Sequence, residues 1–245
     1  MTALRRRWRG TAILVAALTG ISITSSLGFW QLGRAAQKEA MQRSLEERSG
    51  LPALNGTDLA NDADAAPGQH HRAVRLQGRW LVDQTVYLDN RPMNGRAGFI
   101  VITPLLCEPG PRAVLVQRGW IARDARERTR LPDFATPSGR VDVVGEVAAP
   151  PSRLFEFDGA ESGPIRQNLD LAEYARETRL ALHPLSVLQA DSPSTSGDGL
   201  LRQWPRPAVD VHKNYGYAAQ WFALAVLMAG LYVWFQLIQP GLHAH

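Results

Sequence analysis

Two long apolar segments, one near each end of the chain, constrain this sequence more than any other feature. Residues 10–33 carry no charged side chain, and as a helix they would reach about 36 Å, against about 30 Å for the hydrocarbon core of a bilayer. Residues 214–238 are also uncharged, with Tyr and Trp toward both ends, as in the interfacial belts of membrane helices. We therefore expect two transmembrane helices that contact the lipid bilayer.

The charges are distributed so that they report membrane topology. The net charge of +4 equals the contribution of Arg5, Arg6, Arg7 and Arg9, and the region from Arg34 to Lys213 is neutral. A nucleic-acid-binding protein usually carries its excess basic charge on the folded domain. The basic tail instead predicts a cytoplasmic N-terminus by the positive-inside rule, and we expect no nucleic-acid partner.

The first apolar segment has a second interpretation, as a cleaved secretory signal. An Arg-rich start, an apolar run and small residues around Gly33 and Ala35 fit that class. The run is longer than the ~7–15 residues of a signal core, and residues 34–48 read as an unbroken helix that continues it. We favour an uncleaved anchor.

These arguments divide the chain into five parts. Residues 1–9 and 239–245 are cytoplasmic tails, residues 10–33 and 214–238 are transmembrane helices, and residues 34–213 form a periplasmic domain. The protein is thus predicted to be a multi-pass protein of the bacterial inner membrane, with both termini in the cytoplasm.

The central region shows mainly the two-residue period of β-strands. Apolar and polar residues alternate from Ala73 to Trp80, which predicts a strand with one wet face. Asn94-Gly95 supplies hairpin chemistry. Residues 98–106 are apolar on both faces and should end at Pro104. Residues 55–71 are polar and should form an exposed loop.

Further elements follow the same reasoning. Strands are expected at residues 84–89, 112–121, 141–147, 163–169 and 180–189, a short helix at 170–179 with Asp170 as its N-cap, and a flexible loop at 192–199. The predicted fold is an α+β membrane protein. Its two transmembrane helices flank a β-rich domain, a small antiparallel sheet or open barrel with one or two short helices.

No catalytic motif stands out in this domain. Glu156, Asp158 and Glu161 could flank a substrate, but carboxylates in a Gly-containing loop are usually solvated surface charges. His70-His71 and the tail residues His243 and His245 lack further ligands at metal-binding spacing. Cys107, the only cysteine, excludes an intrachain disulfide and is expected to be a buried thiol.

Two glutamines at the outer ends of the apolar segments need an explanation. Gln31 follows Trp30, and Gln220 precedes Trp221. A polar group in a membrane segment costs energy unless it is paired. The two residues either belong to interfacial anchors or mark a place where a cofactor or partner helix docks.

Four short motifs in this order resemble the Surfeit locus protein 1 family, also called Shy proteins, which assist cytochrome c oxidase assembly. The first motif lies in the apolar segment and the last begins the second one. Their positions are Gly28, Trp30, Gln31 and Arg34; Arg91, Gly98, Thr103 and Pro104; Arg118, Gly119 and Trp120; and Tyr217, Gln220 and Trp221.

The resemblance implies a non-enzymatic assembly factor that helps place haem a in oxidase subunit I, beside haem A synthase. It also implies haem binding near the Tyr-Ala-x-x-Trp-Phe motif, so Tyr217, Gln220 and Trp221 become candidate cofactor-binding residues. Bacterial members are thought to use a histidine just before this motif. Asn214 stands at that position here.

Asparagine is a poor ligand for haem iron, and His212 is the nearest replacement. In a helix, two residues rotate a side chain by about 200°, which would place His212 and Asn214 on opposite faces. In an extended segment the two side chains would point the same way. Whether His212 can replace the missing ligand therefore depends on where the helix begins.

Three functions remain open from the sequence. The first is an assembly factor that holds or transfers haem a. The second is a scaffold that stabilises subunit I without binding haem. The third is an anchored periplasmic hydrolase, motivated by the carboxylates at 156–161.

Overall fold

The computed structural model describes residues 2–127, 129–151, 163–205 and 210–239. The chain divides into two compact units. One comprises residues 1–44 and 207–245, and the other residues 45–206. The first unit is helical and the second contains the sheet.

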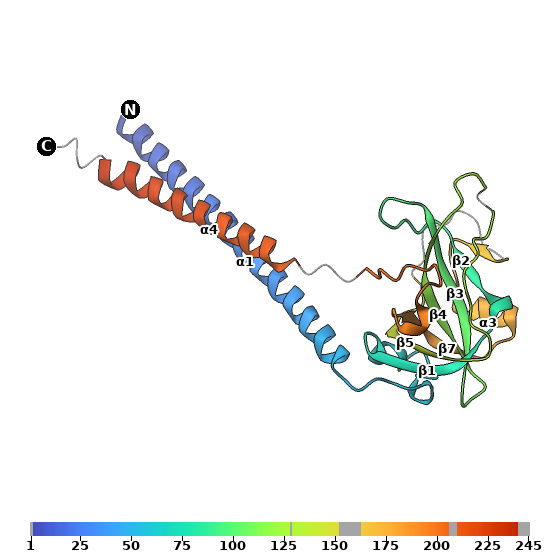
Figure 1. Cartoon of the computed structure of the whole chain (residues 1–245). Helices are drawn as coiled ribbons and strands as arrows, with labels where there is room; N and C mark the ends of the chain where they lie inside the picture. The colour runs from blue at the N-terminus through green and yellow to red at the C-terminus, as the bar shows by residue number, and fades with distance from the viewer. Residues whose placement is uncertain (1, 128, 152–162, 206–209, 240–245) are drawn as a thin grey trace. The chain divides into compact units, whose positions relative to one another are not determined.

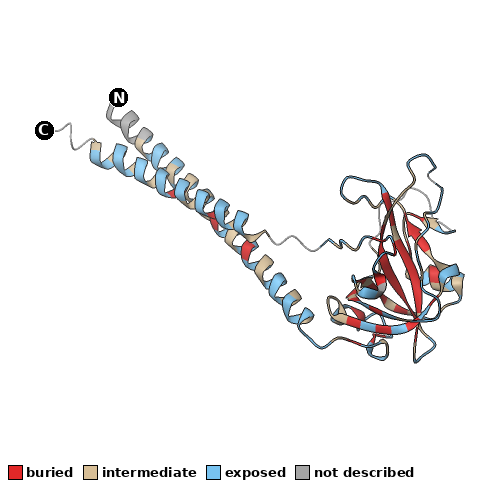
Figure 2. Ribbon diagram, in the orientation of Figure 1, coloured by how far each residue is buried: buried red, intermediate tan, exposed pale blue. Residues whose placement is uncertain are grey.

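Two long helices form the helical unit. Helix α1 spans Thr2–Ser49, and α4 spans Val211–Val233 with a π-helical turn at Trp234–Ile238. The start of α1 lies beside the end of α4, so the helices run antiparallel (Figure 1). Both are long and apolar enough to cross a membrane, and their surfaces are largely exposed (Figure 2).

Small residues on α1 let the two helices approach closely. A Cβ added at Gly28 would lie 2.7 Å from the ring of Phe222, and one at Gly20 would lie 2.9 Å from the sulfur of Met228. The Phe29 ring meets Phe222 edge-on at a centroid distance of 5.2 Å. Contact of a small residue with a large one is a common way for membrane helices to pack.

The helix limits confirm one expectation and locate a helix start that the sequence left open. The predicted helical continuation over residues 34–48 is confirmed, because α1 is unbroken to Ser49. Helix α4 starts at Val211, where the Asp210 side chain caps it by accepting from the Lys213 backbone N–H. The membrane limits at 10–33 and 214–238 stay predictions.

Seven strands form one sheet in the second unit (Figure 1). Their order is β1-β5-β7-β4-β3-β2-β6, and an additional β1–β3 pairing closes part of it into a barrel-like sheet. The strands are β1 Ala73–Trp80, β2 Val86–Leu88, β3 Gly98–Cys107, β4 Ala113–Ala122, β5 Arg140–Ala148, β6 Ile165–Arg166 and β7 Leu182–Gln189. The prediction of a strand-rich domain with an open barrel is confirmed.

The sheet is mixed, so of the two predicted forms, a small antiparallel sheet or an open barrel, the first is wrong. Strand β7 pairs parallel to β4, and β6 pairs parallel to β2. A parallel pair needs a long crossover connection. Helix α3 (Leu171–Thr178) precedes β7 and belongs to such a crossover from β4.

Strand β3 continues through Pro104 to Cys107, which corrects the predicted end. Besides pairing with β4, strand β3 pairs with β2 at residues 100–102 and with β1 at residues 105–107. Pro104 lies between these two ladders, where its carbonyl accepts from the Leu81 N–H at 3.0 Å. The missing N–H of proline therefore costs no ladder hydrogen bond.

The segment 55–71 is not simply an exposed loop. It contains a 3-10 turn at Gly56–Asp58 and a short helix, α2, at Ala66–Gln69. Leu59, Ala60 and Ala66 are buried in the main core cluster with residues of β1, β4, β5 and β7. Because most residues of this segment are polar, its sequence did not predict these three apolar contacts, which cover one end of the barrel.

Local signals in the second unit were reliable. Asn94 and Gly95 both have positive φ, as a two-residue hairpin turn requires. Asp170 caps α3 by accepting from the Glu173 backbone N–H at 2.9 Å. Further 3-10 turns lie at Val82–Gln84 and, within the predicted loop 192–199, at Pro193–Thr195.

Candidate functional site

Asn214 links the two helices of the helical unit. Its Oδ1 accepts a hydrogen bond from the Lys38 ammonium at 2.7 Å, and its Nδ2 donates to Gln31 Oε1 at 2.8 Å. Gln31 and Lys38 lie on one face of α1 because seven residues make almost two full turns. The asparagine thus uses both ends of its amide in contacts with α1.

Two neighbouring contacts extend this polar cluster. The Lys38 ammonium also donates to the Asp210 carbonyl at 3.3 Å, one of the groups at the start of α4. The Tyr215 hydroxyl donates to a Glu39 carboxylate oxygen at 2.8 Å. Only one side chain of this cluster, Gln31, belongs to the four family motifs. The other four are Lys38, Glu39, Asn214 and Tyr215.

Asn214 stands where the resemblance led us to expect a haem-binding histidine, and its amide is engaged through both oxygen and nitrogen. Asn214 is a weak ligand by its chemistry, and its carbonyl oxygen already accepts from Lys38. The Gln31 side chain is paired with Asn214, and the two expectations for it, an interfacial anchor or a docking residue for a cofactor or partner helix, both stay predictions. The structure does not bring Gln220 to this cluster, and its side chain is exposed.

His212 lies within α4, so the helical alternative holds. Its side chain is exposed and rotated by about 200° from that of Asn214. Gly216, Ala219 and Ala223 follow on the same face, at spacings of four, seven and eleven residues, and all three are exposed. His212 thus stands at the N-terminal end of a small-residue face of α4.

The other predicted cofactor-binding residues lie elsewhere on α4. Tyr217 and Gln220 are exposed and Trp221 is half-buried. Trp221 is rotated by about 180° from His212, and Tyr217 by about 140°. The four candidate residues therefore do not share one face. On α1, Trp30 and Arg34 are both exposed.

The motif residues of the sheet unit meet at one end of β3 and β4. The Trp120 indole N–H donates to the Arg91 carbonyl at 2.6 Å, and the Arg91 backbone N–H donates to the Gly98 carbonyl at 3.3 Å. A Cβ at Gly98 would overlap the Trp120 ring and the Ile121 carbonyl. Three motif positions from separate parts of the sequence thus depend on one another for packing.

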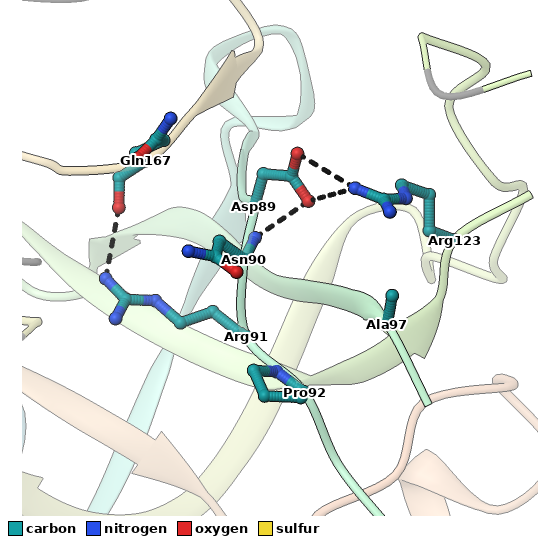
Figure 3. A pocket seen from close by; sticks show the side chains of 7 residues that line it. All are labelled: Asp89, Asn90, Arg91, Pro92, Ala97, Arg123 and Gln167. Atoms are coloured by element: carbon teal, nitrogen blue, oxygen red, sulfur yellow. Dashed lines mark hydrogen bonds and ion pairs between the residues drawn. The ribbon is translucent and has the colours of Figure 1, made fainter. Parts of the chain in front are cut away.

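A pocket of about 240 Å³ opens beside this junction, lined by Asp89, Asn90, Arg91, Pro92, Ala97, Arg123 and Gln167 (Figure 3). The Arg123 guanidinium pairs with both oxygens of Asp89, at 3.1 and 3.2 Å. The Arg91 guanidinium reaches across to the Gln167 carbonyl at 3.1 Å. Burial lowers the Arg91 pKa from its ordinary value.

The remaining sheet motifs are buried in the barrel. Thr103 is fully buried and its hydroxyl lies 3.0 Å from that of Thr85. Arg118 is only 2% exposed. A Cβ at Gly119 would lie 2.8 Å from the Cβ of Leu200, so glycine is needed where residues 200–201 cross β4. Pro104 is a buried position of β3.

Of the residues weighed earlier as chemical candidates, His70 has a buried Nε2 with no hydrogen-bond partner among the described residues. The others have structural partners or lie outside the described part. Cys107 is buried, as predicted, and burial raises its pKa to about 11. His71 Nδ1 lies 2.8 Å from a Glu146 carboxylate oxygen. Glu156, Asp158, Glu161, His243 and His245 lie outside the described residues.

Lys38 is the residue that the sequence reasoning missed. It falls in the charged continuation of α1, where it reads as one of several solvent-facing cations. Its signal was the seven-residue spacing from Gln31, which places both on one helix face. That spacing gains meaning only once the partner helix is known to present Asn214.

A model of the SURF1 family matches residues 18–226 of this chain, which include the whole sheet and most of both long helices. The chain belongs to the SURF1 family. The expected resemblance to the Surfeit locus protein 1 family is thereby confirmed.

Individual SURF1 relatives cover most of the chain. A SURF1-like protein of Rickettsia felis is 28% identical over 90% of this chain and 94% of its own length. An uncharacterized SURF1-like protein of Mycobacterium tuberculosis is 31% identical over 91% and 81%. The cytochrome oxidase assembly protein SHY1 of Saccharomyces cerevisiae is 25% identical over 71% of this chain but 46% of its own length.

Proposed function

We propose that this SURF1 protein is a non-enzymatic assembly factor for an aa3-type cytochrome c oxidase. The family match carries the proposal, together with the name of the yeast relative as a cytochrome oxidase assembly protein. Two helices that can cross a membrane suit a factor acting on a membrane-embedded oxidase. The partner is oxidase subunit I, with haem A synthase as a neighbour.

The placement proposed is the bacterial inner membrane. The Arg-rich N-terminal tail favours a cytoplasmic start, and the antiparallel pairing of α1 and α4 is compatible with a return of the chain to that side. The sheet unit would then lie in the periplasm. A thiol-reactive, membrane-impermeant reagent tests this with single cysteines in a Cys107→Ser background, one at exposed Asp83 and one in the N-terminal tail.

The finer proposal is that the protein holds haem a as cargo on its way to subunit I. His212 supports this, since it is the histidine nearest the Tyr-Ala-x-x-Trp-Phe motif and is free to present its imidazole outward. The small residues Gly216, Ala219 and Ala223 leave room beside it for a flat macrocycle. Asn214 takes no part, because its amide holds the two helices together.

A second candidate function has an observation in its favour. A scaffold that stabilises subunit I without haem would need a rigid helix pair and no ligand. Asn214 accepts from Lys38 and donates to Gln31, which joins the two helices at the position where bacterial members are thought to carry a haem-binding histidine.

Absorption spectra of the purified protein from cells that make haem a separate the two functions. Haem a delivery predicts a haem band that is lost in His212→Ala and kept in Lys213→Ala, the adjacent exposed residue. No haem band in the wild type, with continued co-purification of subunit I, would favour the scaffold. In a strain lacking the gene, an unchanged oxidase spectrum would contradict both.

A further inference from the structure

A cavity of about 280 Å³ lies in the sheet unit, apart from the Arg91 pocket. Its walls come from β1, β4, β5 and β7 and from the segment after β7. The lining residues used below are Trp80, Arg118, Gln189, Thr195 and Asp198. The volume corresponds to about nine water molecules at roughly 30 Å³ each, enough for a small organic molecule.

Arg118 is a buried cation on one wall of this cavity. Its guanidinium lies between the rings of Trp80 and Phe134, 4.5 and 4.8 Å from their centroids. Its terminal nitrogens donate to the Thr136 hydroxyl at 2.6 Å and the Ala135 carbonyl at 3.2 Å. Among the described residues, nothing accepts from Nε. Burial lowers the Arg118 pKa to about 10, so the side chain stays charged at neutral pH.

Gln189 supplies a second unmatched group in the same cavity. The residue is 3% exposed, and no described donor reaches its buried Oε1. A buried polar atom without a partner costs about 1–3 kcal/mol, and native proteins contain few of them. An unused donor on Arg118 and an unused acceptor on Gln189 both belong to residues that line one cavity.

The buried charges around the cavity are unbalanced, whereas Arg140 and Asp142, which also line it, are exposed and opposite in sign. The one buried carboxylate on its wall, Asp198, is bound by the Arg202 guanidinium, and Arg202 itself is 1% exposed. Arg118 has no carboxylate within ion-pair distance among the residues that the structure describes. Arg202 also pairs with the exposed Asp191 at 3.3 Å. Arg118 is therefore the buried cation that lacks a carboxylate among the described residues, which favours an additional anion.

We propose that this cavity binds a small carboxylate with a hydrogen-bond donor on the adjacent carbon, an α-hydroxy or α-amino acid. The carboxylate would accept from Arg118 Nε, and the hydroxyl or ammonium would donate to Gln189 Oε1. Trp80 would cover the apolar part of the ligand. This binding function is independent of the proposed role in oxidase assembly.

Ligand-observed NMR on the full chain in detergent tests the site with three matched probes. Glycolate carries both groups, acetate lacks the donor, and glycolamide lacks the charge; glycine is run as the α-amino counterpart. Saturable binding of glycolate or glycine is expected. Acetate and glycolamide should bind at least about tenfold more weakly, the effect of losing one hydrogen bond to a buried group.

Variants then assign the binding to the cavity. Gln189→Met keeps the side-chain length but removes the acceptor, so it should abolish the preference for glycolate over acetate. Gln117→Met is the matched control. Gln117 is also a buried strand glutamine, but its amide donates to the Ser186 hydroxyl at 3.0 Å and it does not line the cavity. This control should keep the preference unchanged.

The proposal is overturned by either of two results. One is the absence of saturable binding of both glycolate and glycine, which would mean that the cavity holds only water. The other is an unchanged preference in a folded Gln189→Met protein. Because Arg118→Lys could disturb the packing between Trp80 and Phe134, the test rests on Gln189 rather than on Arg118.

Discussion

The Lys38 ammonium on α1 donates to Asn214 Oδ1 on α4 at 2.7 Å, across 176 residues of sequence. The same asparagine returns a hydrogen bond to Gln31 on α1. Because one amide on α4 bonds to two side chains of α1, it fixes both the distance between the two helices and the axial register of α4 against α1. Asn214 is therefore a residue that joins the two helices.

Replacing this amide should loosen the helix pair. Asn214→Leu keeps the volume but leaves Lys38 and Gln31 without their shared partner, so the free energy of unfolding should fall by about 1–3 kcal/mol. Titration with sodium dodecyl sulfate, followed by circular dichroism, measures this. Gln220→Leu is the control, since Gln220 is exposed on the same helix. Equal effects of the two variants would refute the joining role.

The close contact at Gly28 gives a second prediction. In Gly28→Ala the new Cβ would lie 2.7 Å from the Phe222 ring, so the helices must separate or the ring must turn. We expect weaker association of α1 with α4, detected as a lower detergent-unfolding midpoint. Gly33→Ala has open space around its Cβ and should be neutral or slightly stabilising. If Gly28→Ala matches it, the packing at Phe222 is not important for stability.

Local sequence signals predicted most of the elements because each has a short-range cause. Asn94-Gly95 forms its turn through backbone conformations that few residues tolerate, and Asp170 caps its helix through a contact three residues away. The alternation from Ala73 to Trp80 matched β1 to the residue. None of these depends on the rest of the fold.

What the sequence did not predict depends on partners far along the chain. Pro104 stays within β3 because β1 and β2 leave a gap between their ladders, and this gap is a property of the sheet order. Lys38 became part of the candidate site only through Asn214. Likewise, the motif residues Arg91, Gly98 and Trp120 were identified separately, but their mutual contacts follow from the β3–β4 pairing.

The junction of these motif residues gives a third prediction. Gly98→Ala would place a methyl group on the Trp120 ring and the Ile121 carbonyl, both of which are held in the sheet. We expect a loss of about 1–3 kcal/mol in the free energy of unfolding, as for other overpacked cores, measured by urea unfolding of the full chain. Gly68→Ala, with nothing within 4 Å of the added Cβ, is the control. A loss of equal size in both variants would point to a general effect of replacing glycine.

His183 predicts how stability depends on pH. Its ring is 4% exposed, with Nδ1 donating to the Ala60 carbonyl at 3.0 Å, and burial lowers its pKa from the ordinary value of 6.5. The folded state therefore favours neutral histidine. Its contribution to stability is complete above pH 6.5 and is lost as the pH falls from there through the lowered pKa.

Asn at position 183 can make the same hydrogen bond without titrating. The urea midpoint of the wild type should therefore fall between pH 7 and pH 5 more steeply than that of His183→Asn. His70, whose pKa burial also lowers, is present in both proteins and cancels in the comparison. Parallel pH profiles would mean that His183 does not contribute to acid sensitivity.

Cys107 gives the last prediction, a chemical test of the barrel core. Burial raises its pKa to about 11, and the residue is 3% exposed, so at pH 8 the reactive thiolate is both scarce and covered. Alkylation by iodoacetamide in the folded protein should therefore be slower by at least about tenfold than in urea, since thiolate abundance falls tenfold per pKa unit. Gly56 of the 55–71 segment lies beside this side chain, since an added Cβ there would lie 3.4 Å from the Cys107 Cβ, at ordinary contact distance. Rapid alkylation of the wild type would show that the 55–71 segment does not cover the core in solution.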